Sequence, residues 1–225
     1  ARVFDIHGKW IKVAYPQELF ERGNMSQVLS SVAGNIFGMK DLEYLRLEDI
    51  HWPSKLMRSF PGPRFGVKGI RKMLRVAKRP LVGTIIKPKL GLREREHARV
   101  AYEAWSGGID IVKDDENLSS MSFNHFDERI RETLRLRDKA ERETGEKKIY
   151  MPNITSEYKE MVKRAKFVKA QGGEYIMVDI LTVGWSALHA LRNEDLGMVI
   201  HAHRAGHAAF TRLPYHGISM LTIAD

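Results

Sequence analysis

The chain has 225 residues, 43% hydrophobic and 29% charged, so it can form one large or two small domains with a hydrophobic core and is not typical of a disordered protein. Its formal net charge of +9 favours anionic partners, but the basic residues are scattered among acidic ones, which argues against a nucleic-acid-binding surface. It contains no cysteine, which excludes disulfides and thiolate chemistry and fits a cytoplasmic protein, and it has no apolar run of about 18 residues that could span a membrane.

The first part of the chain predicts a small α+β unit. Two strand-like runs, WIKVAYP and LEYLRLEDIHWP, flank a helix expected over residues 25–33. The segment SFPGPRFG then interrupts every regular pattern with proline and glycine, which is typical of a domain boundary. We expect one domain over residues 1–62 and another over 63–225, with both chain ends truncated.

Strands and helices alternate after this boundary. Strands are expected at residues 81–86, 109–112, 148–154, 175–181 and 198–203, with helices at 93–105, 126–142, 156–171 and 186–192 and another starting near 218. This spacing predicts right-handed βαβ units and a parallel sheet. A doubly wound sheet is the alternative, but polar residues at the C-terminal ends of the strands favour a (β/α)8 barrel, of which the first five units are present.

The stretch GGIDIVKDDEN, residues 107–117, places charged side chains at the end of a strand. Alternation puts Lys113 and Asp115 on one side, with Glu116 at the turn, and carboxylate oxygens are ligands for Mg²⁺. Lysine offers only nitrogen, so one interpretation is a solvated turn in which Lys113 neutralises Asp114, Asp115 and Glu116. The other is that CO₂ adds to the unprotonated amine of Lys113 and gives a carbamate, whose oxygens complete a metal site.

Two lysines follow the preceding strand in KPKLGL. Lys87 and Lys89 are two residues apart, so both can point to one side, and repulsion between their ammonium groups would make each give up its proton more easily. This pattern suits a general base or a pair that grips phosphate or enolate oxygens. A basic surface turn is the alternative.

Further polar candidates lie in HAHRAGH and AGNIFGMK. His201 and His203 share one face of a strand and could ligate zinc if a third ligand were present, or be satisfied core histidines. We favour His203 as a hydrogen-bonding partner for a substrate hydroxyl and Arg204 as a phosphate ligand. Asp179 is interpreted as mainly structural, and Asn35 either caps a turn or binds substrate.

Taken together, these motifs resemble the large subunit of ribulose-bisphosphate carboxylase/oxygenase (RuBisCO). GTIIKPKLGL, GGIDIVKDDEN and HAHRAGH occur in that order, with AGNIFGMK before them, and the resemblance runs from about residue 34 to the end. It implies a (β/α)8 barrel preceded by part of an α+β, ferredoxin-like N-terminal domain. Ile85, two residues before Lys87, is similar to the archaeal type III and bacterial type II branches rather than to the plant type.

The resemblance implies a Mg²⁺ site and an activating CO₂. Lys113 resembles the lysine that CO₂ carbamylates, and Asp115 and Glu116 resemble the two carboxylates that complete the metal site. The carbamate on Lys113 is also a candidate base, so Lys113 is expected to be both ligand and catalyst.

The resemblance also implies roles for residues around the substrate. Lys87 resembles the lysine that transfers protons at the substrate carbon skeleton, and His203 resembles an active-site histidine. Lys89 and Arg204 resemble substrate-binding residues, with Arg204 on a phosphate. Asn35 resembles an asparagine that reaches into the partner subunit's site, which implies a homodimer or a larger homo-oligomer.

The implied activity is carboxylation of ribulose 1,5-bisphosphate to 3-phosphoglycerate through a Mg-stabilised enediolate, with O₂ competing with CO₂ for that enediolate. No nucleic acid or membrane partner is expected. Family residues beyond the fifth strand are missing, so the fragment alone is expected to be inactive. The alternatives are a RuBisCO-like enolase or isomerase acting on a related sugar phosphate, and a non-enzymatic basic binding domain.

Overall fold

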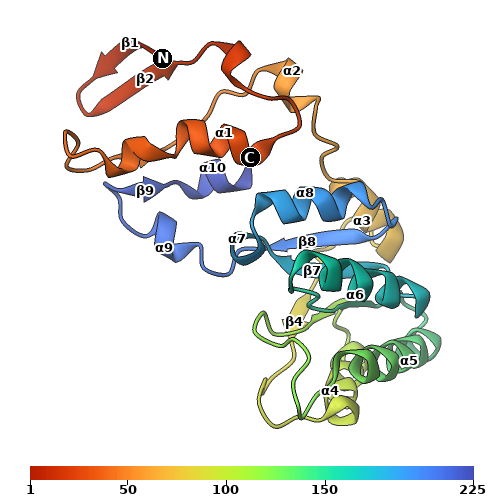
Figure 1. The fold of residues 1–225 in the computed structure, drawn as a ribbon. Coiled ribbons are helices and arrows are strands. Elements are labelled where there is room, and N and C mark those ends of the chain that lie inside the picture. The colour runs from red at the N-terminus through yellow and green to blue at the C-terminus, as the bar shows by residue number, and fades with distance from the viewer. The chain divides into compact units, whose positions relative to one another are not determined.

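The structure is a computed structural model that describes residues 1–225, and these fall into two compact units. The first unit contains Ala1–Pro61 together with Gly206–Asp225, and the second contains Gly62–Ala205 (Figure 1). The boundary at Pro61 lies within the proline- and glycine-rich segment SFPGPRFG. The last twenty residues of the chain, however, belong to the first unit. The domain bounds 1–62 and 63–225 stay a prediction.

The first unit mixes short helices with two small sheets. Its antiparallel hairpin pairs β1 (Arg2–His7) with β2 (Trp10–Ala14), and every residue of both strands is exposed. A parallel pair joins β3 (Arg46–Leu47) to β9 (Gly217–Ile218). The remaining elements are η1 (Gln17–Leu19), α1 (Met25–Val32), η2 (Asn35–Gly38), α2 (Ser54–Met57), α9 (Ala208–Thr211) and α10 (Met220–Ala224).

Local sequence explains where α1 begins and where the chain turns after it. The Asn24 side chain accepts a hydrogen bond from the Gln27 N–H at 3.1 Å, a typical N-cap. After the helix, a Cβ atom on Gly34 would lie 2.0 Å from the carbonyl oxygen of Ser30. Only glycine therefore fits this position of the AGNIFGMK motif.

The second unit is built on parallel strands that neighbour one another in chain order. The strands β4 (Gly83–Ile85), β5 (Ile111–Lys113) and β6 (Ile149–Met151) form one sheet, and β7 (Tyr175–Asp179) pairs with β8 (Val199–His203). A parallel bridge between Asn153 and Met177 links the end of β6 to β7. The expected alternation of parallel strands and helices is confirmed, although β7 ends at Asp179 and gives way to a helix where a longer strand was expected.

Helices of the second unit connect these strands (Figure 1). They are α4 (Glu94–Ser106), α5 (Phe126–Thr144), α6 (Tyr158–Ala170), α7 (Ile180–Val183) and α8 (Trp185–Asn193), while α3 (Gly66–Leu74) precedes β4. On α4 the buried residues His97, Ala101 and Trp105 recur every four positions and form one face of the helix. Trp105 is fully buried in the main hydrophobic core, where its indole N–H donates to the Ile149 carbonyl at 3.2 Å. None of the helices has both the length and the apolar character needed to cross a membrane.

Candidate active site

The candidate site is centred on the end of β5, at Lys113. Strand register places Lys113 between Ile85 of β4 and Met151 of β6. Its ammonium group donates to the Asp114 carbonyl at 2.9 Å and to the Glu116 carboxylate at 3.3 Å, with the side chain 22% exposed. Lys113 and Glu116, predicted as metal ligands, therefore lie in direct contact.

The loop after β4 brings Lys87 to the same end of β5. Its ammonium group forms an ion pair with the carboxylate of Asp115, which is buried and also accepts the Asn117 N–H at 2.9 Å. Burial alone would raise the pKa of Asp115, but the hydrogen bonds from Lys87 and Asn117 bring it below its usual value. The strand end thus gathers two lysines and two carboxylates.

The pKa shift of Lys87 has the opposite direction to the one that the sequence predicts. We expected repulsion from Lys89 to ease proton loss, but the hydrogen bond to Asp115 raises the pKa of Lys87. Both lysine side chains are exposed, and Lys87 forms an ion pair with Asp115. The expected lowering at Lys87 is therefore wrong for this arrangement, in which the ammonium form is favoured.

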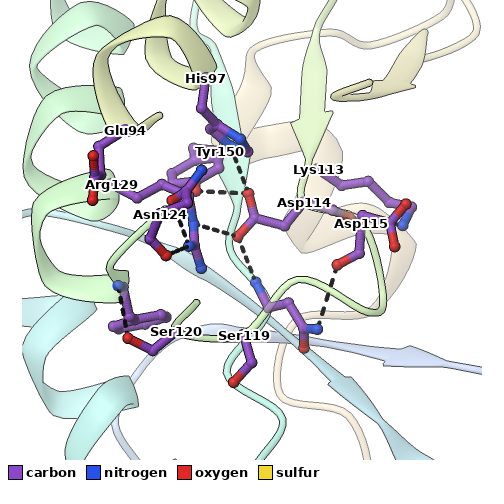
Figure 2. A network of polar contacts seen from close by, with 12 residues as sticks. Glu94, His97, Lys113, Asp114, Asp115, Ser119, Ser120, Asn124, Arg129 and Tyr150 are labelled. Carbon is purple, nitrogen blue, oxygen red and sulfur yellow. Dashed lines mark hydrogen bonds and ion pairs between the residues drawn. The ribbon is translucent and has the colours of Figure 1, made fainter. Parts of the chain in front are cut away.

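Asp114 lies on the opposite side of the strand end and is completely buried (Figure 2). One carboxylate oxygen, Oδ1, accepts the Tyr150 hydroxyl at 2.7 Å and lies 3.0 Å from His97 Nε2. The other, Oδ2, accepts the Asn153 N–H at 3.1 Å and the Arg129 Nε–H at 3.3 Å. The interpretation of Asp114 as part of a solvated turn is wrong, because its partners come from the helix layer and from the next strand.

The electrostatics of this cluster, formed by Asp114, His97, Arg129, Tyr150 and Asn153, favour an ionised carboxylate. Burial by itself would raise the pKa of Asp114, but the charge of Arg129 and the hydrogen bond from His97 lower it from 3.8 to about 2. Burial raises the pKa of Tyr150 well above its usual value, so its hydroxyl stays a donor. The cluster therefore fixes the residue that lies between two candidate metal ligands, Lys113 and Asp115.

Sequence reasoning missed this cluster. Tyr150 lies in the strand expected over residues 148–154 and has no chemical signal of its own, and Arg129 is one charge in a helix with many. One available signal was alternation, since Asp114 must point away from the side that Lys113 and Asp115 share. A second was position, because Arg129 falls on the buried face of α5 with Ile130.

His203 ends β8 beside Asp179, which ends β7. The two residues are register partners, and His203 Nδ1 lies 2.8 Å from the Asp179 carboxylate. Burial raises the pKa of Asp179. Burial, followed by the charges of His203 and Lys113, lowers the pKa of His201, which favours the neutral ring. Asp179 thus contacts His203 and can orient its ring, while its mainly structural role stays a prediction.

The remaining predicted residues are exposed. Arg204 follows β8 directly, and Lys89 lies in the loop after β4, both in the second unit. Asn35 lies in the first unit as the initial residue of η2. The structure therefore brings together Lys87, Lys113, Asp115 and Glu116 through direct contacts, while the placement of Asn35 in a shared site stays a prediction.

The donor set at Lys113 fits Mg²⁺ on one condition. Asp115 and Glu116 offer hard oxygen ligands of the kind that Mg²⁺ prefers. Each of the two carboxylates pairs with a lysine ammonium group, which shows that this position accommodates positive charge. Lys113 can join them as an oxygen donor only after CO₂ has converted its amine to a carbamate. A different triad, Glu94, His125 and Glu128, brings possible ligand atoms within 4.8 Å of one another, but it is largely exposed and does not include His201 or His203.

Comparisons with known proteins identify the family. Residues 66–225 match the ribulose bisphosphate carboxylase large chain catalytic domain, and residues 1–56 match the N-terminal domain of the same chain. The ribulose bisphosphate carboxylase of Methanocaldococcus jannaschii is 55% identical over 214 residues, which cover 95% of this chain and 50% of that protein.

Solved structures agree with this match. Octameric Rubisco from Pyrococcus horikoshii, solved with sulfate ion, has a TM-score of 0.97 at 53% identity over 99% of this chain and 54% of that one. Dimeric archaeal Rubisco from Hyperthermus butylicus has a TM-score of 0.94 at 48% identity, over 99% of this chain and 53% of that one. The chain spans about half the length of these relatives. It belongs to the ribulose bisphosphate carboxylase large-chain family and is similar to its archaeal, type III members.

Proposed function

We propose that the full-length protein carboxylates ribulose 1,5-bisphosphate to two molecules of 3-phosphoglycerate, with O₂ competing for the same intermediate. The observation that carries this proposal is the contact set at the end of β5, where Lys113 meets Glu116 and Lys87 meets Asp115. The names of the relatives, ribulose bisphosphate carboxylase among them, support the same reaction. The proposal concerns a longer protein because this chain spans about half of each relative.

In the proposed site, carbamylated Lys113, Asp115 and Glu116 hold Mg²⁺. When bound, the cation supplies a fixed positive charge that favours negative charge on substrate oxygens. The buried Asp114 cluster keeps the backbone between Lys113 and Asp115 in place, so the ligand side chains can turn to the cation from a fixed backbone.

Chain residues around this position take the proton-transfer and binding roles. Lys87 carries a proton that it can exchange with the substrate carbon skeleton once Asp115 turns to the metal. His203 directs Nδ1 to Asp179, which leaves Nε2 to hydrogen-bond a substrate hydroxyl. Lys89 and Arg204 are exposed cations suited to binding the anionic substrate, with Arg204 on one of its phosphates.

The proposal includes the rest of the architecture. Five parallel strands in chain order support the first part of a (β/α)8 barrel, and the mixed first unit supports part of a ferredoxin-like domain. We also propose a homodimer or larger homo-oligomer in which Asn35 enters the partner's site, since relatives are described as dimeric and octameric. A cytoplasmic location is proposed with this activity.

The test is incorporation of labelled CO₂ by the full-length protein, given ribulose 1,5-bisphosphate after preincubation with bicarbonate and Mg²⁺. We expect labelled phosphoglycerate only when both activators are present. A folded protein that fixes no label would overturn the carboxylase and favour an enolase or isomerase related to Rubisco. Salt-dependent binding to nucleic acid, unaffected by the bisphosphate, would favour a basic binding domain.

A further inference from the structure

Asn153 is a buried residue between β6 and β7 that contacts the backbone of the candidate metal ligands. Its side chain is almost completely buried. The amide Nδ2 donates to the carbonyl oxygen of Glu116 at 2.7 Å and lies within hydrogen-bond distance of the carbonyl of Asp115 at 3.4 Å. One amide group thus spans the two consecutive residues whose carboxylates are expected to bind the metal.

The other polar atoms of Asn153 fix its orientation. Its backbone N–H donates to Asp114 Oδ2 at 3.1 Å, and its Oδ1 accepts from the Thr155 N–H at 3.0 Å and the Thr155 hydroxyl at 2.6 Å. Because a flipped amide would lose these bonds and place Nδ2 against two donors, only one orientation satisfies the site. The donor therefore points at Glu116 and Asp115.

The same residue connects to the second half of the site. The Thr155 hydroxyl, which donates to Asn153, accepts the Asp179 N–H at 3.0 Å. Asp179 in turn lies 2.8 Å from His203 Nδ1. A continuous hydrogen-bonded path therefore runs from the loop after β5, through Asn153, to the end of β8.

The loop after β5 needs such support. Regular strand structure ends at Lys113 and the next helix begins only at Phe126, so Asp115 and Glu116 lie outside both elements. The directions of their side chains depend on the peptide groups that Asn153 holds. We propose that Asn153 is a positioning residue that directs Asp115 and Glu116 toward a divalent cation and links this loop to the Asp179 and His203 pair. The inference rests on the proposed function.

Asn124 offers a matched control. It is equally buried and bonds to Arg129, another residue of the Asp114 cluster, with its Nδ2 donating to the Leu92 carbonyl at 3.1 Å. Replacing Asn124 removes an amide that contacts the cluster through Arg129 but leaves the carbonyls of Asp115 and Glu116 with their partners. It therefore separates general damage to the cluster from loss of ligand direction.

The experiment compares Asn153→Ala and Asn124→Ala in the full-length protein. Mg²⁺ affinity is measured by calorimetry in the presence of bicarbonate, and the carbamate on Lys113 by ¹³C NMR after labelling with ¹³CO₂. We expect Asn153→Ala to weaken Mg²⁺ binding by roughly 10- to 100-fold, as for other residues that orient metal ligands, and to reduce the carbamate signal. Asn124→Ala should keep the Mg²⁺ affinity of the unsubstituted protein even if its thermal stability falls as far as that of Asn153→Ala.

Equal affinity in Asn153→Ala and the unsubstituted protein would overturn the inference, as would equal weakening in both variants. If Asn153→Ala does not fold, Asn153→Asp serves instead, because it keeps the acceptor for Thr155 and loses only the donors. Its added charge would by itself favour a cation, so weaker binding supports the inference and unchanged or tighter binding overturns it. An unsubstituted protein that takes up neither CO₂ nor Mg²⁺ overturns the proposed function, and this inference with it.

Discussion

Arg129 Nε lies 3.3 Å from Asp114 Oδ2, and neither side chain is exposed to solvent. Burying two charges is unfavourable unless each keeps its partners, so removing one member leaves the other uncompensated. The Asp114 carboxylate has three further contacts, with Tyr150, His97 and the Asn153 N–H. A single substitution in this pair should therefore destabilise the fold next to the candidate site.

Asp114 should make stability depend on pH in the acid range. Its pKa is lower in the folded protein, about 2, than the ordinary 3.8, so its ionisation stabilises the fold fully above about pH 4 and progressively less as the pH falls toward 2. The depression corresponds to roughly 2 kcal/mol. Thermal unfolding of the full-length protein and of Asp114→Asn, measured from pH 6 to pH 2.5, should show a stability difference that shrinks below pH 4. A difference that stays constant with pH would contradict this assignment.

Replacing Lys113 should abolish carboxylation without unfolding the protein. Lys113→Ala removes the only amine in the candidate metal set, and the side chain is partly exposed rather than packed in the core. Lys113→Arg is the matched control for charge, because it can still pair with Glu116 but cannot form a carbamate in the same way. Labelled CO₂ fixation should be lost in both variants while their melting temperatures stay near that of the parent. Activity retained by either variant would contradict the proposed metal site.

Lys87→Met should separate proton transfer from metal binding. The substitution removes the cation that pairs with Asp115, whose carboxylate then has one competitor fewer for Mg²⁺. We expect Mg²⁺ affinity to be kept or increased while turnover falls by at least about 100-fold, the usual effect of losing a general acid or base. The measurements are Mg²⁺ titration and exchange of the substrate's carbon-bound hydrogen with solvent. Normal exchange in the variant would assign the proton transfer to another group.

Two inactive variants should complement each other if Asn35 enters the partner's site. Asn35→Ala and Lys113→Ala each damage every site in their own homodimer, but a mixed dimer keeps one site with both native residues. Random pairing after co-expression should restore about a quarter of the sites. Labelled CO₂ fixation by the co-expressed pair, compared with each variant alone, tests this. The absence of rescue in confirmed mixed dimers would count against a shared site.

The sequence predicted the alternation of strands and helices because each strand after residue 81 is a short apolar run bounded by turn residues. It also placed Lys113, Asp115 and Glu116 at a strand end, where the structure has them. It did not predict β1, whose residues RVFDIH mix charged and apolar side chains with no clear face and are all exposed.

The contacts of the site were harder to predict than its position. That Lys87 would pair with Asp115, or that Tyr150 would donate to Asp114, depends on segments 28 and 36 residues apart. The local sequence pattern does not indicate which residues so far apart in the chain will be in contact. Asn153 was part of an N-x-T sequence with no expected role, because its function in the fold lies in the direction of one amide, which only the packed backbone sets.

Asp114 and Asp115 are the same residue type in adjacent positions, but they face opposite sides of β5's end. A survey of all substitutions would score both as intolerant for different reasons. At Asp114 the amount of intact protein in the cell would fall, whereas at Asp115 the amount would hold and the turnover of each molecule would fall. Measuring protein abundance alongside growth would therefore distinguish the roles of the two neighbouring aspartates of the KDDE motif.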